Sequence, residues 1–125
     1  MKIKYYKNTS YRGVLNWNKT NKYSNGIVIK IREKGELLGS VLVKENWITY
    51  LVINPKFRGK GLGTILLRKA EELISKKYNE VKLIPQDNEQ ILRNWYEKKG
   101  YISIPLDTIG YEEENKEYWV MTKYF

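Results

Sequence analysis

The alternation of apolar and polar positions predicts a series of short strands in the first half of the chain. Residues 27–31, 37–43 and 47–53 are runs rich in β-branched and aromatic residues, and such runs are typical of strands. A turn at residues 34–36 joins the first two runs, and Asn54-Pro55 ends the third. Weaker runs predict four further strands, at residues 1–6, 81–84, 101–104 and 118–122.

Two segments instead show helical spacing. The firmer one follows Gly61, and its polar positions fall on the opposite face from a regular apolar series: Leu62, Ile65, Leu66, Ala70, Leu73 and Ile74. A second helix is expected to begin at Asp87, which has capping-box spacing with Gln90, and to end at Gly100. The order of these elements predicts an α/β chain built around one mixed sheet.

Length and composition limit what the chain can be. Its 125 residues fit a single domain spanning 1–125, with 42% apolar and 30% charged residues. No apolar run approaches the roughly 20 residues that span a bilayer, and the start has no apolar signal segment, so we expect a cytoplasmic protein without a membrane partner. The absence of cysteine and histidine excludes disulfides, thiolate nucleophiles and the commonest metal ligands, so no metal is expected.

The charge adds a preference for anionic partners. The formal net charge is +9 at pH 7. A phosphate-rich cofactor, nucleic acid or an anionic membrane surface would each suit this charge, as would a merely lysine-rich solvated surface. The cations are dispersed along the sequence, so we expect that nucleic acid is not the partner.

The segment Arg58-Gly59-Lys60-Gly61-Leu62-Gly63 carries the clearest chemical signal. It lies between a strand and the amphipathic helix, where unpaired backbone N–H groups and the helix dipole attract anions. Alternating glycines let a phosphate approach the backbone, and Arg58 and Lys60 add positive charge. A dinucleotide fingerprint needs glycine where Thr64 stands, and a Walker loop needs Gly-Lys-Ser/Thr. The segment therefore predicts a pyrophosphate site, with a plain tight turn as the alternative.

The segment from Val52 to Gly63 resembles motif A of the GNAT superfamily of N-acetyltransferases. In that motif a strand ending in Val-x-Pro precedes Gln or Arg, two residues, Gly, one residue, and Gly or Ala; Arg58, Gly61 and Gly63 occupy the fixed positions. A second segment, with Asn88, Ile91 and residues 95–101, is similar to the family's Asn…Tyr-Glu-Lys-x-Gly-Phe motif. The resemblance implies a GNAT-like, mostly antiparallel sheet flanked by helices, with an abbreviated N-terminal helical region, because residues 8–25 are too short and polar for two helices.

The resemblance also implies an acetyl-CoA site. The backbone of the glycine-rich loop would bind the CoA pyrophosphate, the strand end before it would pair with the pantetheine arm and the acetyl carbonyl, and Asn88 would touch that arm. In the family this strand separates from the next one, and the thioester lies in the gap. The residues implied in cofactor binding are Leu51, Val52, Ile53, Arg58, Gly59, Lys60, Gly61, Leu62, Gly63, Thr64 and Asn88.

Direct transfer of an acetyl group to an amine needs a base, a polarised carbonyl and an acid for the leaving thiolate. The resemblance puts Tyr96 near the sulfur as general acid; a ring simply packed on its helix is the alternative. The strands at 47–53 and 81–84 contain no carboxylate, so the base is expected to act through water, with Glu45 or a member of the acidic stretch 107–117 as candidates.

The acidic stretch stands out in a basic chain. Between residues 107 and 117, five carboxylates against one lysine give a local charge of −4. In the family this connection borders the acceptor site, so Glu112, Glu113 and Glu114 are candidates for attracting a cationic amine such as a polyamine, lysine, a basic peptide or an aminoglycoside; a solvated loop is the alternative. With so short an N-terminal region, the acceptor site is either open or completed by a second subunit, in a monomer or a homodimer.

Three classes of function remain at this stage. The first is an N-acetyltransferase with acetyl-CoA as cosubstrate. The second is a non-catalytic acyl-CoA-binding module that keeps the phosphate loop without a base. The third is a basic nucleic-acid-binding domain, which would require cations clustered with aromatic residues on one face.

Overall fold

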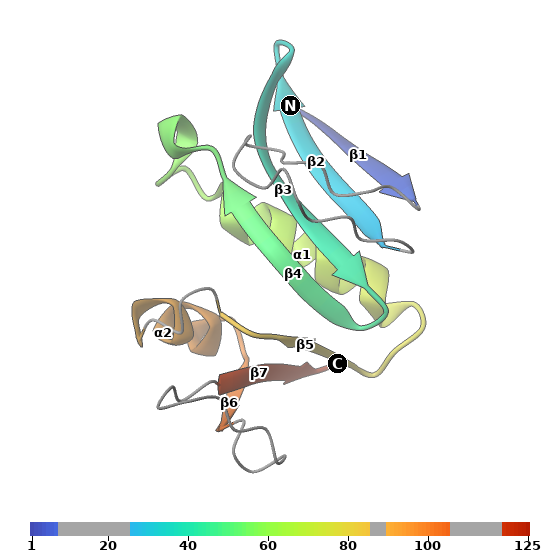
Figure 1. Cartoon of the computed structure of the whole chain (residues 1–125), viewed down its shortest axis with the longest axis vertical. Coiled ribbons are helices and arrows are strands. Elements are labelled where there is room, and N and C mark those ends of the chain that lie inside the picture. The colour runs from blue at the N-terminus through green and yellow to red at the C-terminus, as the bar shows by residue number, and fades with distance from the viewer. Residues whose placement is uncertain (8–25, 86–89, 106–118) are drawn as a thin grey trace, which may run out of the picture.

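The computed structural model describes residues 1–7, 26–85, 90–105 and 119–125, arranged as one seven-stranded sheet with helices (Figure 1). The strand order is β1-β2-β3-β4-β5-β7-β6, and the neighbouring strands are antiparallel except for the parallel pair β4–β5. The elements are β1 (Lys2–Lys7), β2 (Ile27–Glu33), β3 (Glu36–Lys44), β4 (Trp47–Ile53), the 3-10 helix η1 (Pro55–Phe57), α1 (Leu62–Ser75), β5 (Glu80–Leu83), α2 (Gln90–Lys98), β6 (Ile102–Pro105) and β7 (Trp119–Tyr124).

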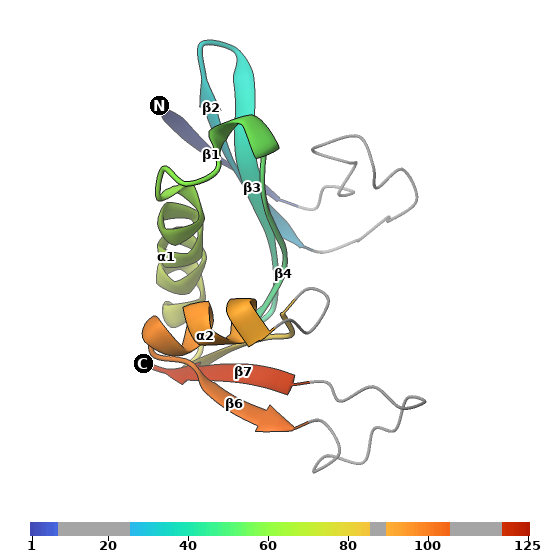
Figure 2. The ribbon, with the colours of Figure 1, turned by 90° about the vertical axis from the view of Figure 1, so that its left-hand side faces the viewer.

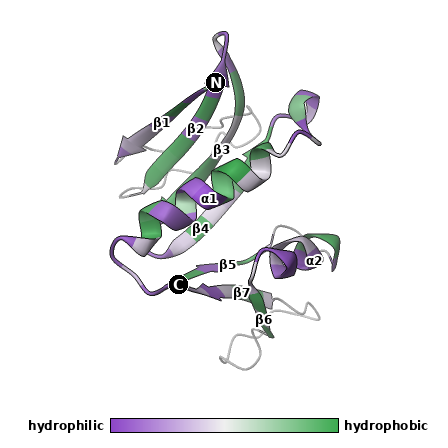
Figure 3. Cartoon of the chain, turned by 180° about the vertical axis from the view of Figure 1, so that it is seen from behind, coloured by the Kyte–Doolittle hydropathy of each residue, from purple (hydrophilic) through white to green (hydrophobic). Residues whose placement is uncertain are grey.

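Helix α1 packs on one face of β2, β3, β4 and β5 (Figure 2). Its apolar stripe consists of Leu62, Leu66, Leu67, Ala70 and Ile74, all of which are buried. These side chains share one core with the inward residues of the sheet, and the green strands beneath the helix in Figure 3 show the same apolar surface. The period of the sequence pattern thus sets which face of α1 is buried.

The expected fold class is confirmed: the sheet is mixed and mostly antiparallel, with helices beside it. The predicted strands and both helices are present, and their end points within the described residues differ from the predicted ones by at most two residues. The first hairpin turn consists of Lys34 and Gly35, both with positive φ, and Glu36 already belongs to β3. Gly100 follows α2 with φ of 98°, as expected for a left-handed helix end.

Part of the sequence-based expectation lies outside the described residues. This applies to the loop at 8–25, to the predicted start of α2 at Asp87, and to the acidic stretch 107–117. Among the helices that the structure describes, none has the length and apolar character needed to cross a membrane.

Candidate functional site

Strands β4 and β5 form an opening in the middle of the sheet. They pair only at Trp47 with Lys82 and at Ile48 with Leu83. Beyond these pairs β4 continues to Ile53, whereas β5 ends at Leu83, and the two strands diverge in Figure 1. From Leu51 to Ile53, the backbone of β4 therefore has no ladder partner on its β5 side among the described strands. Such a strand edge can pair with the amide groups of an extended ligand.

A β-bulge bends β4 at the point where the opening begins. The register between β3 and β4 shifts between Ser40, which faces Val52, and Leu42, which faces Thr49. Tyr50 lies in this bulge with φ of 52°, a left-handed conformation that is rare for an aromatic residue. Its ring packs beside Val28 and Leu42. Strain of this kind costs about 1–3 kcal/mol and concentrates where a backbone must be aimed at a ligand.

The glycine-rich loop leaves open space above its backbone. Gly59 and Gly61 have φ of 80° and 79°, and a Cβ atom added at either position would meet no protein atom within 4 Å. Glycine is therefore favoured at both positions by the backbone conformation. No protein atom fills the space that a side chain would occupy there. A phosphate group can approach the loop backbone from this side.

The N-terminus of α1 is uncapped by any side chain. Gly61 is the N-cap residue and has no side chain to bond the first amides, and the first turn contains no acidic residue. The first intrahelical bond runs from the Ile65 N–H to the Gly61 carbonyl, at 3.2 Å. Helix geometry thus leaves the N–H groups of Leu62, Gly63 and Thr64 without helical partners. Unpaired N–H groups of this kind, together with the helix dipole, attract anions.

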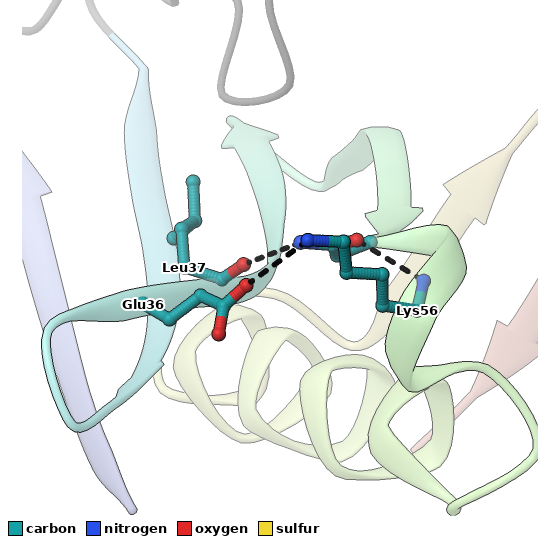
Figure 4. A network of polar contacts seen from close by, with 4 residues as sticks. Glu36, Leu37 and Lys56 are labelled. Carbon is teal, nitrogen blue, oxygen red and sulfur yellow. Dashed lines mark hydrogen bonds and ion pairs between the residues drawn. The ribbon is translucent and has the colours of Figure 1, made fainter.

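The loop is held in place by contacts to strand ends on either side. The Asn54 side chain donates to the Leu37 carbonyl at 3.1 Å and accepts from the Lys56 N–H at 3.1 Å. The Lys56 ammonium lies 4.0 Å from the Glu36 carboxylate, and Figure 4 shows how these contacts join β3 to η1. Arg58 donates through Nε to the Ile53 carbonyl at 3.3 Å. Its guanidinium is exposed next to the loop.

Two glycines near the loop differ in how closely they are packed. Gly63 lies in the first turn of α1, where an added Cβ would be 3.8 Å from the Trp95 ring of α2. That distance is ordinary van der Waals contact, so packing against α2 does not require glycine at this position. Gly39 was not expected to matter, yet a Cβ there would lie 2.8 Å from Ile53 Cδ1 and 2.9 Å from the Val52 carbonyl. Only glycine fits beneath the end of β4.

Tyr96 lies on the buried side of α2. It is 6% exposed, and its ring makes edge-on contacts with Trp95 and Tyr101 at centroid distances of 4.9 and 5.5 Å. Desolvation by burial raises the pKa of Tyr96 to about 12. The phenol therefore keeps its proton at neutral pH, as both a general acid and a packed core tyrosine would.

The structure brings together only part of the residues expected at the site. The end of β4, the loop and the start of α1 are contiguous, with Trp95 of α2 alongside. Glu45 is exposed in the turn before β4, at the end where β4 and β5 are paired rather than separated. Asn88 and Glu112–Glu114 lie outside the described residues. Within the described part of the chain, no cluster of three or more carboxylates is placed to hold a metal ion.

The same fold occurs in solved structures of low sequence identity. A GNAT family acetyltransferase from Elizabethkingia anophelis with acetyl-CoA bound has a TM-score of 0.64 at 16% identity, covering 80% of this chain and 76% of its own. The IAA acetyltransferase from Bacillus cereus has a TM-score of 0.65 at 19% identity, covering 80% and 78%. Escherichia coli ElaA has a TM-score of 0.70 at 14% identity, covering 98% and 99%.

The comparison with family models covers most of the chain. The model of the acetyltransferase (GNAT) family matches residues 3–101, a range that contains the opening, the loop and both helices. The chain belongs to the acetyltransferase (GNAT) family.

Proposed function

We propose that the chain transfers the acetyl group of acetyl-CoA directly to a primary amine while both substrates are bound. As a GNAT acetyltransferase, it is an acetyl-CoA-dependent N-acetyltransferase. The observation that carries the proposal is the uncapped start of α1 behind two positive-φ glycines, at the end of a strand whose edge is open. The acetyl-CoA bound in the Elizabethkingia anophelis structure supports the same cosubstrate here.

The loop and the strand would hold different parts of the cosubstrate. The pyrophosphate fits the N–H groups of residues 58–64, with Arg58 and Lys60 adding charge. The pantetheine arm, which contains amide groups, fits the free edge of β4 at Leu51, Val52 and Ile53. Asn88 would contact the same arm. The bulge at Tyr50 turns the strand backbone just before these residues, so that one of its N–H groups can polarise the thioester carbonyl.

The chemistry needs two proton transfers. Tyr96 is the proposed general acid, because its phenol stays neutral and can donate to the departing sulfur. Alkylamines have a pKa near ~10.4, so a base must first remove a proton from the acceptor. The position of Glu45 at the paired end of β4 favours the acidic stretch over Glu45 as the source of this base, acting through water. Since the chain has no cysteine, an acetyl-cysteine intermediate is excluded, which favours direct attack.

The acceptor is proposed to be cationic. The local charge of −4 between residues 107 and 117 opposes the sign of the whole chain. Several carboxylates acting on a polyvalent amine give a larger effect than the ~1 kcal/mol of one close exposed pair. Replacing Glu112, Glu113 and Glu114 with Gln should raise KM for polyamines and basic peptides at low salt while leaving acetyl-CoA affinity intact. An unchanged KM would show that the amine is recognised elsewhere.

A thiol-release assay tests the activity itself. Purified protein is incubated with acetyl-CoA and, separately, polyamines, aminoglycosides, basic peptides and amino acids, and free CoA thiol is measured. Amine-dependent release with an acetylated product of matching mass supports the proposal. Calorimetric binding of acetyl-CoA without release for any amine would instead identify a non-catalytic acyl-CoA-binding module.

A further inference from the structure

A second group of cations lies outside the loop, on strands β1 and β2. In the antiparallel register Lys2 is directly opposite Arg32, and Lys4 is directly opposite Lys30. Directly opposed residues lie on the same face of a sheet, with Cβ atoms about 4.5–5.5 Å apart. The four cations therefore form two like-charged pairs on one face, which is opposite to the face that contains the buried Ile29 and Ile31.

These cations line a hollow in the surface. The hollow has a volume of about 550 Å³. Its lining consists of the two pairs with the turn and the chain start beside them: Met1, Lys2, Lys4, Lys30, Arg32, Glu33, Lys34 and Gly35. Five cationic side chains thus surround it against one carboxylate. That carboxylate, Glu33, has the Met1 amino group 4.0 Å away.

The arrangement is unfavourable for the free protein. Like charges directly opposite each other destabilise a strand pair. Within the described residues, none of the five cationic side chains has a carboxylate within 4.0 Å. Repulsion confined to one hollow is relieved when an anion enters it, and this is the arrangement expected of a binding site rather than of a dispersed solvated surface.

The chemistry of the hollow favours phosphate groups. Arg32 offers a planar fork that suits phosphate oxygens, and lysines act as point charges for the same groups. The neighbouring aromatic residue on this face, Tyr6, has the Lys30 ammonium 5.0 Å from its ring centroid. Since a lysine already covers that ring, it is a poor platform for stacking a base. The charges, rather than the ring, are available to a ligand.

We propose that the β1–β2 hollow binds a chain of phosphate groups, supplied either by inorganic polyphosphate or by the backbone of a single-stranded nucleic acid. The site is separate from the glycine-rich loop, which contributes no residue to the lining. It gives the cationic excess of the chain a second location besides the cosubstrate site. It also provides the clustered cations, although not the stacking aromatics, of a nucleic-acid-binding surface.

The test compares two double variants that remove the same charge. Lys4→Gln with Arg32→Gln takes one cation from each like-charged pair, and Lys76→Gln with Lys77→Gln takes two exposed cations that follow α1. Binding of inorganic polyphosphate, a single-stranded oligonucleotide and poly-glutamate is measured by fluorescence anisotropy over a salt series. Acetyl-CoA affinity, measured by calorimetry, is expected to be the same in all three proteins and reports intact folding.

The expected result is a loss on the order of tenfold in polyphosphate or oligonucleotide affinity for the β1–β2 variant only, with a salt slope reduced by about 1.4 for a single strand. Which of the two phosphate probes binds more tightly identifies the source. Without ligand, the β1–β2 variant should melt at the same temperature as wild type or higher, because repulsion has been removed. An equal loss in the Lys76/Lys77 variant, or poly-glutamate binding as tight as the phosphate probes, would overturn the proposal.

Discussion

The Tyr101 hydroxyl donates a 2.7 Å hydrogen bond to the Glu71 carboxylate in the middle of α1. The other oxygen of Glu71 lies 3.2 Å from the Lys123 ammonium of β7, and the Glu71 residue is only 8% exposed. Helix α1 packs mainly on β2–β4 and also contacts β5, whereas Tyr101 and Lys123 belong to the β6–β7 side of the sheet. Glu71 thus ties together the two parts of the molecule between which β4 and β5 diverge.

Removing the charge of Glu71 should therefore destabilise the fold. In Glu71→Gln the amide can still accept from Tyr101, but Lys123 loses its ionic partner, and we expect a loss of about 1–3 kcal/mol in the free energy of unfolding. The matched control is Glu72→Gln, the next residue on the exposed side of α1, whose ion pair with Lys69 is at the surface. That change should cost no more than about 1 kcal/mol. Urea denaturation followed by circular dichroism measures the loss of stability in each variant. Equal losses would contradict a stabilising link through Glu71.

The same cluster should make stability fall at alkaline pH. Burial raises the pKa of Tyr96 to about 12, and burial followed by the hydrogen bond to Glu71 raises that of Tyr101 further. Both groups have an unfolded pKa near ~10, so above that pH the unfolded chain releases protons that the folded one keeps, and stability decreases. Below pH 10, neither tyrosine makes the free energy of unfolding depend on pH.

Substitution isolates the contribution of one tyrosine. Between pH 10 and 11.5, Tyr96→Phe should lose stability less steeply than wild type, by about 1.4 kcal/mol per pH unit. Titrating lysines affect both proteins alike, so the difference reports Tyr96. Urea denaturation at several pH values gives the free energy of unfolding of each protein as a function of pH. If wild type and Tyr96→Phe lose stability at the same rate, the Tyr96 phenol titrates freely in the folded state.

The sequence predicts the regular elements well because their signals are local. The spacing of Leu62, Leu66 and Ala70 sets the buried face of α1, and the glycines before it indicate the phosphate loop. Tyr50 shows the limit of such signals. An aromatic residue is typical of a strand, so its positive φ and the bulge follow only from how β4 registers against β3.

The other unexpected residues also depend on tertiary pairing. Gly39 looks like an ordinary strand glycine until Ile53 and Leu66 are placed against it. Glu71 falls among the charged positions of α1 and becomes buried only because Tyr101 and Lys123 cover it. Lys4 and Lys30 are 26 positions apart, and their opposition needs the β1–β2 register. Long-range register is the information that a pattern along one chain lacks.

The loop should fail to bind CoA when a side chain fills the space above it. Gly61→Val places a β-branched side chain at a φ of 79°, in the empty space above the start of α1. We therefore expect CoA binding to be lost. Gly35→Val is the matched control, because Gly35 has the same φ of 79° and the same empty surroundings in the first hairpin turn. Both should lose about 1–3 kcal/mol of stability. Calorimetric titration with CoA separates them, and equal affinities would refute phosphate binding at the loop.

Tyr96→Phe should reduce turnover without weakening acetyl-CoA binding. The change removes the hydroxyl proton and leaves the ring packed against Trp95 and Tyr101. For a general acid the loss in kcat is about 10²–10⁴-fold, whereas KM for acetyl-CoA should stay near its wild-type value. The measurement is steady-state thiol release with an amine identified by the acceptor assay.

The neighbouring tyrosine supplies the control for that experiment. Tyr101→Phe also deletes a buried hydroxyl, and it should cost stability through Glu71 while keeping kcat within about twofold, because Tyr101 has no proposed part in proton transfer. The pH profile adds an independent readout: with a pKa of about 12, Tyr96 should remain a competent donor throughout the range from pH 6 to 10. Equal losses in the two variants would mean that both tyrosines serve the core. A loss confined to Tyr96 would place the general acid on α2.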